Sequence, residues 1–360
     1  MKEIIFNLTV IAFVTLLIFS PTSFAQQKHK KLSPLFEIDK ERKPFNRATR
    51  PRAKSYMGPI IDVHSHIFDR RNQLDFDKII AEMDKSGVTR IFVMPTPNEG
   101  RYIEKEDNAT ARRMFNRIAN KRAGRFCGST YLTAWMNRTF REGYEPSDLK
   151  QRLLLLKSDI TLGGCLGVGE IGPYHFEKRL GQWVLNFKMN FKPMIELVQL
   201  VARLDVWLDL HAEPVNPEGI SYEAEVFGGI NYLFQKAPNL KVILAHTGMT
   251  NAQNAERLMV MHPNLMMHLK FKRPNRNLSW NNLGPLMNEK KKLFEDWAQL
   301  FEAMPNRFMV GMDARFGSNR YSYSKYSRKI RQVRKLLGSL DPTAAKLIAW
   351  QNASQLWPLK

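Results

Sequence analysis

The sequence predicts an α/β protein folded as a (β/α)8 TIM barrel. From Pro59 onward, short apolar runs rich in β-branched residues recur, and stretches with helical periodicity lie between them. Alternating strands and helices imply parallel strands joined by right-handed crossovers. Eight such units in roughly 300 residues suit a closed barrel. The predicted strands are Ile60–His64, Thr89–Met94, Phe126–Tyr131, Leu166–Ile171, Val206–His211, Val242–His246, Leu265–Leu269 and Phe308–Met312.

The helical stretches support the same fold. An open doubly wound sheet is the alternative, but it would place a glycine-rich phosphate turn after the first strand. Here the first strand ends in His64-Ser65-His66, which disfavours that alternative. The predicted helices are Asp77–Lys85, Ser147–Lys157, Pro193–Arg203, Ala252–Met261 and Lys291–Met304.

The N-terminus is typical of an export signal. Lys2 precedes the apolar run Ile4–Phe19, and Ser23-Phe24-Ala25 offers small residues for cleavage after Ala25. We therefore expect a signal peptide at residues 1–25, a basic arm at 26–56 and the barrel at 57–360. The mature protein is expected to be exported, either periplasmic or secreted. An uncleaved membrane anchor is the alternative.

The net charge of +21 is concentrated in two segments of the 360-residue chain. Residues 26–57 hold ten Lys or Arg against three acids, and Arg320–Lys335 holds seven basic residues and no acid. Both are interpreted as solvated surfaces, with weak association with an anionic envelope surface as the alternative. We expect no specific nucleic-acid partner, because the basic residues lie mainly in the arm and the late helix, without interleaved aromatics at the predicted barrel mouth. The sequence leaves the oligomeric state open.

Two cysteines are too few for a disulfide scaffold or a cysteine-rich zinc module. Cys127 and Cys165 lie near the starts of the third and fourth predicted strands. Neighbouring parallel strands give poor disulfide geometry, so the sequence predicts two free, buried thiols.

Polar residues at the strand ends predict a metal centre. His64 and His66 lie on one face of the first strand because side chains alternate along a strand. Other predicted strands also carry a metal-ligand residue type near their carboxyl ends, where barrel enzymes build their sites. Leaving these groups without partners in a barrel interior would be costly. The candidate ligands are His64, His66, Glu170, His211, His246 and Asp313.

This pattern resembles the amidohydrolase superfamily. The resemblance rests on Asp62-Val63-His64-Ser65-His66, His211, Ala245-His246-Thr247-Gly248 and Gly311-Met312-Asp313, together with an Asn352-Ala353 helix near the C-terminus. It runs from Pro59 to Trp357.

The resemblance implies a divalent metal cofactor, zinc being expected, with one or two ions. It implies that His64, His66 and Asp313 hold a first ion and that His211 binds the first or a second. His246 would bind the second ion or the substrate. Glu170 lies in a segment similar to the bridging carboxylate of TatD-type hydrolases, with a role in orienting a histidine as the alternative.

The expected function is hydrolysis of an amide, ester or lactone bond by metal-activated water. Asp313 would act as ligand and proton acceptor, and His246 would polarise the scissile group. The alternatives are a mononuclear metal-dependent decarboxylase, a TatD-like phosphodiester hydrolase and an inactive barrel that only binds.

Substrate contacts are expected from the loops after the strands. The candidates are Arg315, Tyr174, His175 and Trp135, and Lys270 follows the seventh strand. The basic candidates indicate a small anionic substrate.

Further residues have weaker predictions. We expect Phe271–Lys291 to form a lid and His268 to be a satisfied core residue or one that orients a ligand. Asp62 and Asp209 are expected to face the interior, where they hydrogen-bond imidazoles or satisfy other polar groups.

Overall fold

The computed structural model describes residues 53–68, 74–97, 122–176, 183–216, 219–270, 286–288, 290, 292–318 and 321–358. The predicted signal peptide, most of the basic arm, most of the predicted lid and Arg320 lie outside these residues. Within these ranges, none of the helices combines the length and apolarity needed to cross a bilayer.

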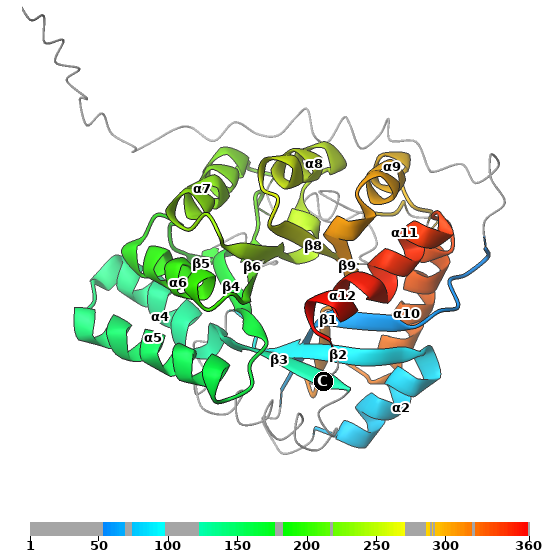
Figure 1. Cartoon of the computed structure of the whole chain (residues 1–360), viewed down its shortest axis with the longest axis horizontal. Coiled ribbons are helices and arrows are strands. Elements are labelled where there is room, and N and C mark those ends of the chain that lie inside the picture. Colours follow the sequence, from blue (N-terminus) through cyan, green and yellow to red (C-terminus); the bar gives the residue numbers. More distant parts are fainter. Residues whose placement is uncertain are drawn as a thin grey trace, which may run out of the picture.

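Eight parallel strands form a closed barrel, which confirms the predicted fold (Figure 1). The barrel closes because β1 pairs with β2 on one side and with β9 on the other. Two short strands extend the sheet: β5 (Trp183–Asn186) runs antiparallel to β4, and β10 (Ala314–Phe316) runs parallel to β1. The barrel strands are β1 (Ile60–Ile67), β2 (Val88–Met94), β3 (Ala123–Gly128), β4 (Gly167–Phe176), β6 (Trp207–Ala212), β7 (Lys241–Leu244), β8 (Leu265–Leu269) and β9 (Phe308–Val310).

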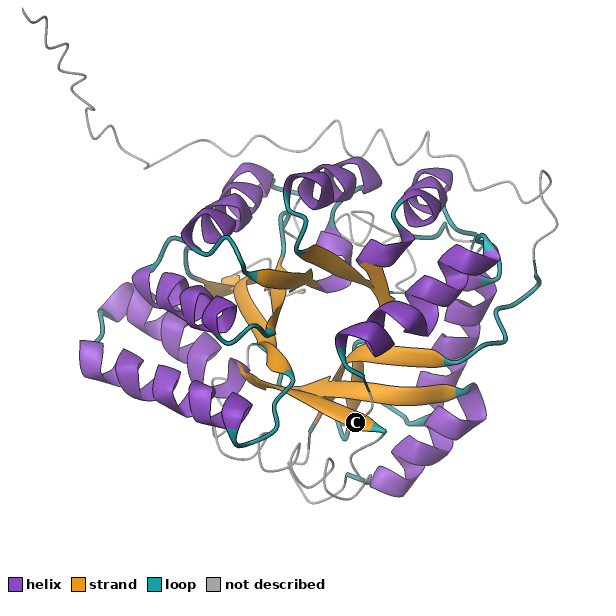
Figure 2. Cartoon of the chain, viewed as in Figure 1, coloured by secondary structure: helices purple, strands orange, loops and turns teal. Residues whose placement is uncertain are grey.

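Helices surround the strands (Figure 2). The predicted helix Ala252–Met261 is confirmed at both ends, and α9 begins four residues later than predicted, at Glu295. The helices are α2 (Phe76–Ser86), α4 (Ser129–Glu142), α5 (Pro146–Thr161), α6 (Lys192–Arg203), α7 (Glu223–Lys236), α8 (Ala252–Met261), α9 (Glu295–Ala303), α10 (Ser324–Leu337), α11 (Pro342–Lys346) and α12 (Asn352–Leu356).

Local signals explain where the first of these helices begins and ends. The Asp75 side chain accepts a hydrogen bond from the Lys78 backbone N–H, which caps the N-terminus of α2. Gly87 ends the helix in the left-handed conformation, with φ of 67°, which glycine adopts without steric cost. Ile79 and Met83 recur at helical spacing and are buried against the barrel.

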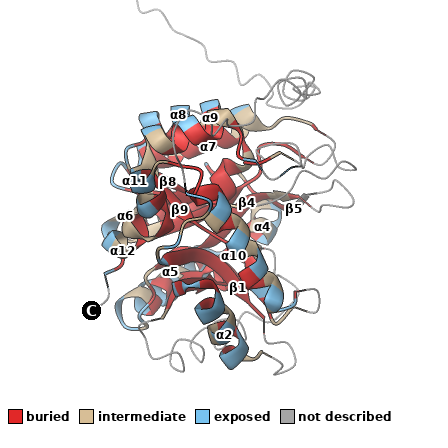
Figure 3. Ribbon diagram, turned by 90° about the vertical axis from the view of Figure 1, so that its right-hand side faces the viewer, coloured by how far each residue is buried: buried red, intermediate tan, exposed pale blue. Residues whose placement is uncertain are grey.

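Apolar side chains fill the barrel interior away from the strand carboxyl ends. Trp357, at the end of α12, packs its ring 4.7 Å from that of Phe92 and 5.5 Å from that of Phe126. Its carbonyl accepts a hydrogen bond from Arg90 at 2.7 Å. The buried strands appear as a red inner layer in Figure 3. The C-terminal segment therefore closes one end of the barrel and leaves the polar groups at the other.

Several predicted strand boundaries are wrong; β9, for example, ends at Val310 and not at Met312. β3 ends at Gly128, and Tyr131 lies in α4, because Gly128 has φ of 98° and breaks the extended run. β7 ends at Leu244, and His246 lies in the following turn η2 (Ala245–Met249) with φ of 59°. Apolar and aromatic runs of this length fit either a strand or a buried helix.

The cysteine prediction is also wrong, because Cys127 and Cys165 form a disulfide with a Cα–Cα distance of 6.0 Å. Pairing of β3 with β4 begins at Phe126 opposite Gly167, so Cys165 precedes the paired region. The turn before it contains Gly164 with φ of 74°. Cys165 is therefore not restricted by strand register and can approach Cys127.

The basic face of α10 is only partly solvated, which corrects the prediction for two of its residues. The Arg334 guanidinium donates hydrogen bonds to the carbonyls of Tyr56, Gly58, Ser86 and Gly87. Lys329 turns inward, and its ammonium donates to the Met312 carbonyl at 3.3 Å. Both cations donate to backbone carbonyls near the two ends of β1. A count of charges cannot distinguish such buried contacts from solvated side chains.

The disulfide should contribute measurably to stability. We expect the double variant Cys127→Ser, Cys165→Ser to lose about 3–4 kcal/mol of unfolding free energy, because the bond closes a segment with a sequence separation of 38. Guanidinium unfolding checks this. Dithiothreitol should destabilise the wild type by a similar amount and leave the double variant unchanged. Equal stability of the oxidised wild type and the variant would contradict the prediction.

Candidate metal centre

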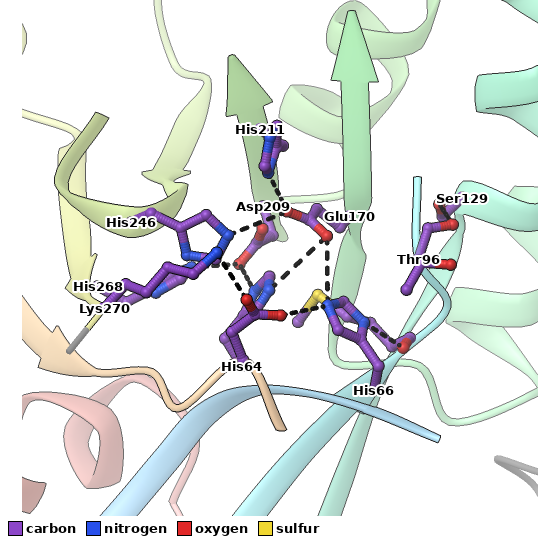
Figure 4. A network of polar contacts seen from close by, with 12 residues as sticks. His64, His66, Thr96, Ser129, Glu170, Asp209, His211, His246, His268 and Lys270 are labelled. Atoms are coloured by element: carbon purple, nitrogen blue, oxygen red, sulfur yellow. Dashed lines mark hydrogen bonds and ion pairs between the residues drawn. The ribbon is translucent and has the colours of Figure 1, made fainter. Parts of the chain in front are cut away.

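Glu170 of β4 lies at the centre of the polar cluster, with 2% of its surface exposed (Figure 4). Its Oε1 atom lies 2.5 Å from His211 Nδ1 and 3.7 Å from His246 Nε2. Its Oε2 atom lies 3.5 Å from His66 Nε2 and 3.7 Å from His64 Nε2. One buried carboxylate is therefore close to four imidazoles that come from three other parts of the barrel wall.

Asp313 completes the set from the break between β9 and β10. Its Oδ1 atom lies 3.3 Å from His66 Nε2, and its backbone N–H donates to the His64 carbonyl at 2.8 Å. Asp313 has φ of 45°, a left-handed conformation that is uncommon outside glycine. This kink turns the carboxylate toward the cluster. The structure thus brings together all six candidate ligands, while their roles stay predictions.

Two triads made up wholly of candidate ligands have the composition of metal sites. In each triad, one ligand atom per residue lies within 4.8 Å of the others. The triads are His64, His66 and Asp313, and Glu170, His211 and His246. His64 Nε2 and His246 Nδ1 are buried without a hydrogen-bond partner among the described residues. His64 Nε2 faces Glu170, so a divalent cation between them would give this buried nitrogen a partner.

Two imidazoles are oriented through their outer nitrogens. His64 Nδ1 lies 3.1 Å from Asp209 Oδ2, and His66 Nδ1 lies 3.0 Å from the Met94 carbonyl. Both acceptors hold a proton on Nδ1, so Nε2, which faces Glu170, is the nitrogen whose lone pair would bind a metal. The prediction that Asp209 hydrogen-bonds an imidazole is confirmed.

Asp62 plays a different part. Its carboxylate accepts hydrogen bonds from the backbone N–H groups of His64 and Met312 and from the hydroxyls of Ser65 and Tyr326. None of these donors is an imidazole. Asp62 therefore joins β1 to the segment after β9 and to α10.

His268 of β8 lies beside the cluster. Its ring stacks on that of His64 with centroids 4.2 Å apart, and its Nε2 lies 3.7 Å from Asp209 Oδ2. Neither ring nitrogen has a hydrogen-bond partner among the described residues. A satisfied core histidine does not fit this observation. Gly311 permits the packing, because a Cβ there would clash with His268 Nδ1.

Electrostatics in the cluster favour charged pairs. Burial lowers the pKa values of His64 and His211, but the nearby carboxylates outweigh it and raise both to about 9. Burial raises the pKa of Glu170, but His211 and His64 outweigh it and hold that pKa below its usual value. His246 differs, because burial and the Lys270 ammonium lower its pKa well below the usual range.

Lys270 forms an ion pair with Asp313, with its Nζ 2.6 Å from Asp313 Oδ2. Burial raises the pKa of Asp313, but Lys270 and His66 outweigh it, so the pKa lies well below its usual value. The carboxylate is therefore ionised at neutral pH. The sequence pointed to Lys270 only as a basic residue after the seventh strand.

The predicted substrate-binding residues are spread over the mouth and beyond it. Arg315 is exposed, with its guanidinium carbon 5.4 Å from the centre of the Phe68 ring. Tyr174 is buried, and burial together with Glu225 raises the pKa of its hydroxyl.

Trp135 lies in α4, buried, with its ring 5.6 Å from that of Tyr144 and with the Arg152 guanidinium 5.0 Å away. Tyr174 and Trp135 as pocket walls stay predictions, as does Arg315 as a substrate contact.

His175 lies closer to the cluster than the other three. Its Nδ1 atom is 2.7 Å from Glu213 Oε1 and 3.0 Å from His211 Nε2. Sequence reasoning missed Glu213, which is buried two residues after His211. The alternation of side chains along a strand was the available signal, because it places Glu213 on the same face as His211.

Metal affinity should depend on pH. A metal must displace the protons that His64 and His211 hold below their pKa values of about 9. We expect the apparent affinity for Zn²⁺ to rise from pH 6.5 toward about 9, by up to about tenfold per pH unit for each displaced proton, and then to level off. Chelator competition, corrected for chelator protonation, measures this. A flat profile would contradict it.

Comparisons with known proteins support the fold. No family model matches the chain, and no curated protein matches it. The crystal structure of the uncharacterized TIM-barrel protein Bb4693 from Bordetella bronchiseptica has a TM-score of 0.52 at 12% identity, covering 83% of this chain and 98% of that one. The β-aspartyl dipeptidase of Fervidobacterium islandicum AW-1 has a TM-score of 0.52 at 13% identity, with coverage of 83% and 72%.

A third similar structure is 4-oxalomesaconate hydratase, LigJ, from Rhodopseudomonas palustris. Its TM-score is 0.50 at 13% identity, covering 83% of this chain and 95% of that one. Identities this low establish a shared barrel fold and no more. The fold and the cluster together define a TIM barrel with a candidate metal centre at the carboxyl ends of its strands.

Proposed function

We propose that this protein is a metal-dependent hydrolase of the amidohydrolase superfamily that acts on an amide, ester or lactone bond. The observation that carries the proposal is the buried convergence of four imidazoles and two carboxylates at one end of the barrel. The β-aspartyl dipeptidase with the same fold is a hydrolase by its name. Barrel enzymes place catalytic groups at this end.

In this proposal the two triads hold one or two divalent ions. His64, His66 and Asp313 would hold the first ion, and Glu170, His211 and His246 the second. Zinc is the proposed metal because imidazole and carboxylate ligands suit it. A bound ion would supply Lewis acidity and lower the pKa of a water molecule to about 7.

Asp313 is the proposed proton acceptor. It is ionised at neutral pH, and its two oxygens face different partners, His66 on one side and Lys270 on the other. It would take a proton from the attacking water and return it to the leaving group. His246, whose low pKa keeps it neutral, would polarise the scissile carbonyl either directly or, as a ligand, through the second ion.

Metal content and turnover test the proposal together. We expect metal-loaded protein to hydrolyse a member of a panel of amides, esters and lactones, and chelation to abolish that activity. Asp313→Asn should lower kcat by about 10²–10⁴-fold, because it removes the proton acceptor. Elemental analysis must show that the variant retains metal. The control is Asp205→Asn, an exposed residue paired with Lys241. Full turnover by metal-loaded Asp313→Asn would rule out the assigned role.

The same experiment separates the alternatives. LigJ is a hydratase by its name, so this barrel is not restricted to hydrolysis. One metal per chain with release of carbon dioxide would favour a decarboxylase. Turnover restricted to phosphodiesters would favour the TatD-like alternative.

We propose further that the substrate is small and anionic. The Lys270 and Lys329 ammonium groups contact the adjacent residues Asp313 and Met312. Lys325 and Lys329 also lie 5.3 and 5.8 Å from the centre of the Tyr321 ring. The Lys270 and Lys329 ammonium groups therefore lie beside Asp313, and the attraction of an anionic substrate group to them supports the proposal.

Lys329→Met tests this substrate class. Losing a charged hydrogen bond costs about 1.5–3 kcal/mol, so KM for an anionic substrate should rise by about tenfold or more while kcat changes little. An uncharged analogue should show no such change. Lys346→Met, at an exposed site in α11, is the matched control. An equal loss with charged and uncharged substrates would contradict the proposal.

We propose that the protein works outside the cytoplasm. The N-terminal segment supports this, and so does the disulfide, because such bonds persist mainly in oxidising compartments. Attachment of the basic arm to an anionic envelope surface remains part of the same proposal.

A further inference from the structure

We propose that Glu213 is a positioning residue that aims His211 at the metal held by Glu170, His211 and His246. Its carboxylate would fix the proton of His211 on Nε2 and leave the Nδ1 lone pair free for the metal. This inference rests on the proposed metal-dependent function and assigns a role to a residue outside the six candidate ligands.

The two nitrogens of His211 face two carboxylates. Nδ1 lies 2.5 Å from Glu170 Oε1, and Nε2 lies 2.9 Å from Glu213 Oε1. A neutral imidazole has one N–H and one lone pair, and an ionised carboxylate can only accept. When His211 binds a metal through one nitrogen, only the other nitrogen carries a proton. Only one of the two carboxylates can therefore accept a hydrogen bond from His211.

The residues around His211 indicate which carboxylate accepts the hydrogen bond from its N–H. Glu170 also faces His64, His66 and His246, so the Nδ1 side is where a cation would lie. Glu213 is on the opposite side of the ring. Its hydrogen-bond acceptance from Nε2 then leaves Nδ1 available as a ligand.

Glu213 is itself held in place from β4. The His175 Nδ1 atom lies 2.7 Å from Glu213 Oε1, and the Phe176 backbone N–H lies 3.4 Å from Oε2. His175 Nδ1 and His211 Nε2 are 3.0 Å apart, and both can donate to the same carboxylate oxygen. The carboxylate is 5% exposed, so water competes little for these contacts.

The same arrangement recurs at two other candidate ligands. Asp209 accepts from His64, and the Met94 carbonyl accepts from His66. Each acceptor lies behind the ring, and the remaining nitrogen faces Glu170. Glu213 therefore accepts from the outer nitrogen of His211, as Asp209 does from that of His64. His246 has no such acceptor for its Nδ1 among the described residues.

A cation among His175, His211 and Glu213 is the competing arrangement, because their ligand atoms are also within 4.8 Å of one another. It would take the Nε2 lone pair of His211. A neutral imidazole has one lone pair, so the inner metal would then lose His211 as a ligand. The position of Nδ1 against Glu170 favours the inner metal.

Co²⁺ titration of the metal-free full-length chain tests the inference. We expect the wild type to bind two ions. Glu213→Gln should lower the affinity for one of these ions by about 10–100-fold, the usual effect of losing a hydrogen-bond partner of a metal ligand. The other ion should bind within about threefold of the wild type. Glu213→Ala serves if the glutamine still accepts the hydrogen bond, and circular dichroism confirms folding. Glu223→Gln is the matched control, since Glu223 is partly buried and accepts from Thr250 and Asn254.

A double-mutant cycle shows whether Glu213 acts through His211. If it does, Glu213→Gln should change Co²⁺ affinity in the wild-type background and have no further effect in a His211→Ala background. The Co²⁺ absorption spectrum should also change in the first case only. A merely structural role would weaken binding in both backgrounds.

Several outcomes would overturn the inference. One is unchanged Co²⁺ affinity in both Glu213 variants, and another is an equal loss of affinity for both ions. The others are a wild type that binds a single Co²⁺ whose affinity does not depend on Glu213, and a wild type that binds a third Co²⁺ which the Glu213 variants no longer bind. None of them decides the proposed function. Conversely, Glu213-dependent binding of Co²⁺ in a protein without hydrolytic activity would reject the function and leave the positioning role standing.

Discussion

The structure depends on the burial of one carboxylate, Glu170, among four imidazoles. A buried charge without partners would destabilise the fold by several kcal/mol, so the surrounding elements must supply partners at close range. In the metal-free protein protons do this, and the pKa values of His64 and His211 rise to about 9. A divalent ion would replace those protons. Stability and metal binding therefore depend on the same groups, because the contacts that orient the imidazoles toward Glu170 also orient them toward a metal.

The barrel brings these partners together at one end only. Apolar side chains fill the other end, and the backbone at the polar end departs from regular strand geometry. Trp357 packs against Phe92 and Phe126 and fills the closed end. At the open end, His246 and Asp313 adopt left-handed backbone conformations with φ of 59° and 45°. Such conformations are held only where the surrounding structure determines them. At Asp313 the hydrogen bond from its N–H to the His64 carbonyl contributes to this, and both left-handed residues lie at the proposed site.

The positive charge of the chain has several separate uses in the described residues. Arg334 joins α10 to the segments at the start of β1 and the end of α2 through backbone carbonyls. Lys270 and Lys329 contact residues 313 and 312 beside the cluster. A net charge of +21 therefore does not describe a single surface. Burial of the alkyl stems of these side chains, with the charged end on a specific acceptor, separates structural cations from solvated ones.

Patterns in the sequence are enough to predict the barrel and most of the residues that form the cluster. Alternating strands and helices limit the topology, and polar residues at strand ends such as His66 and Glu170 stand out against apolar neighbours. They could not show Glu213 behind His211, the His268 ring nitrogens that lack a hydrogen-bond partner among the described residues, or the disulfide between Cys127 and Cys165. Nor could they show that Tyr131 is helical. Each of these depends on distances between segments far apart in the chain or on backbone angles at single residues. Only the tertiary structure decides them, because side-chain periodicity specifies a face of a strand and not the atom that another strand places opposite it.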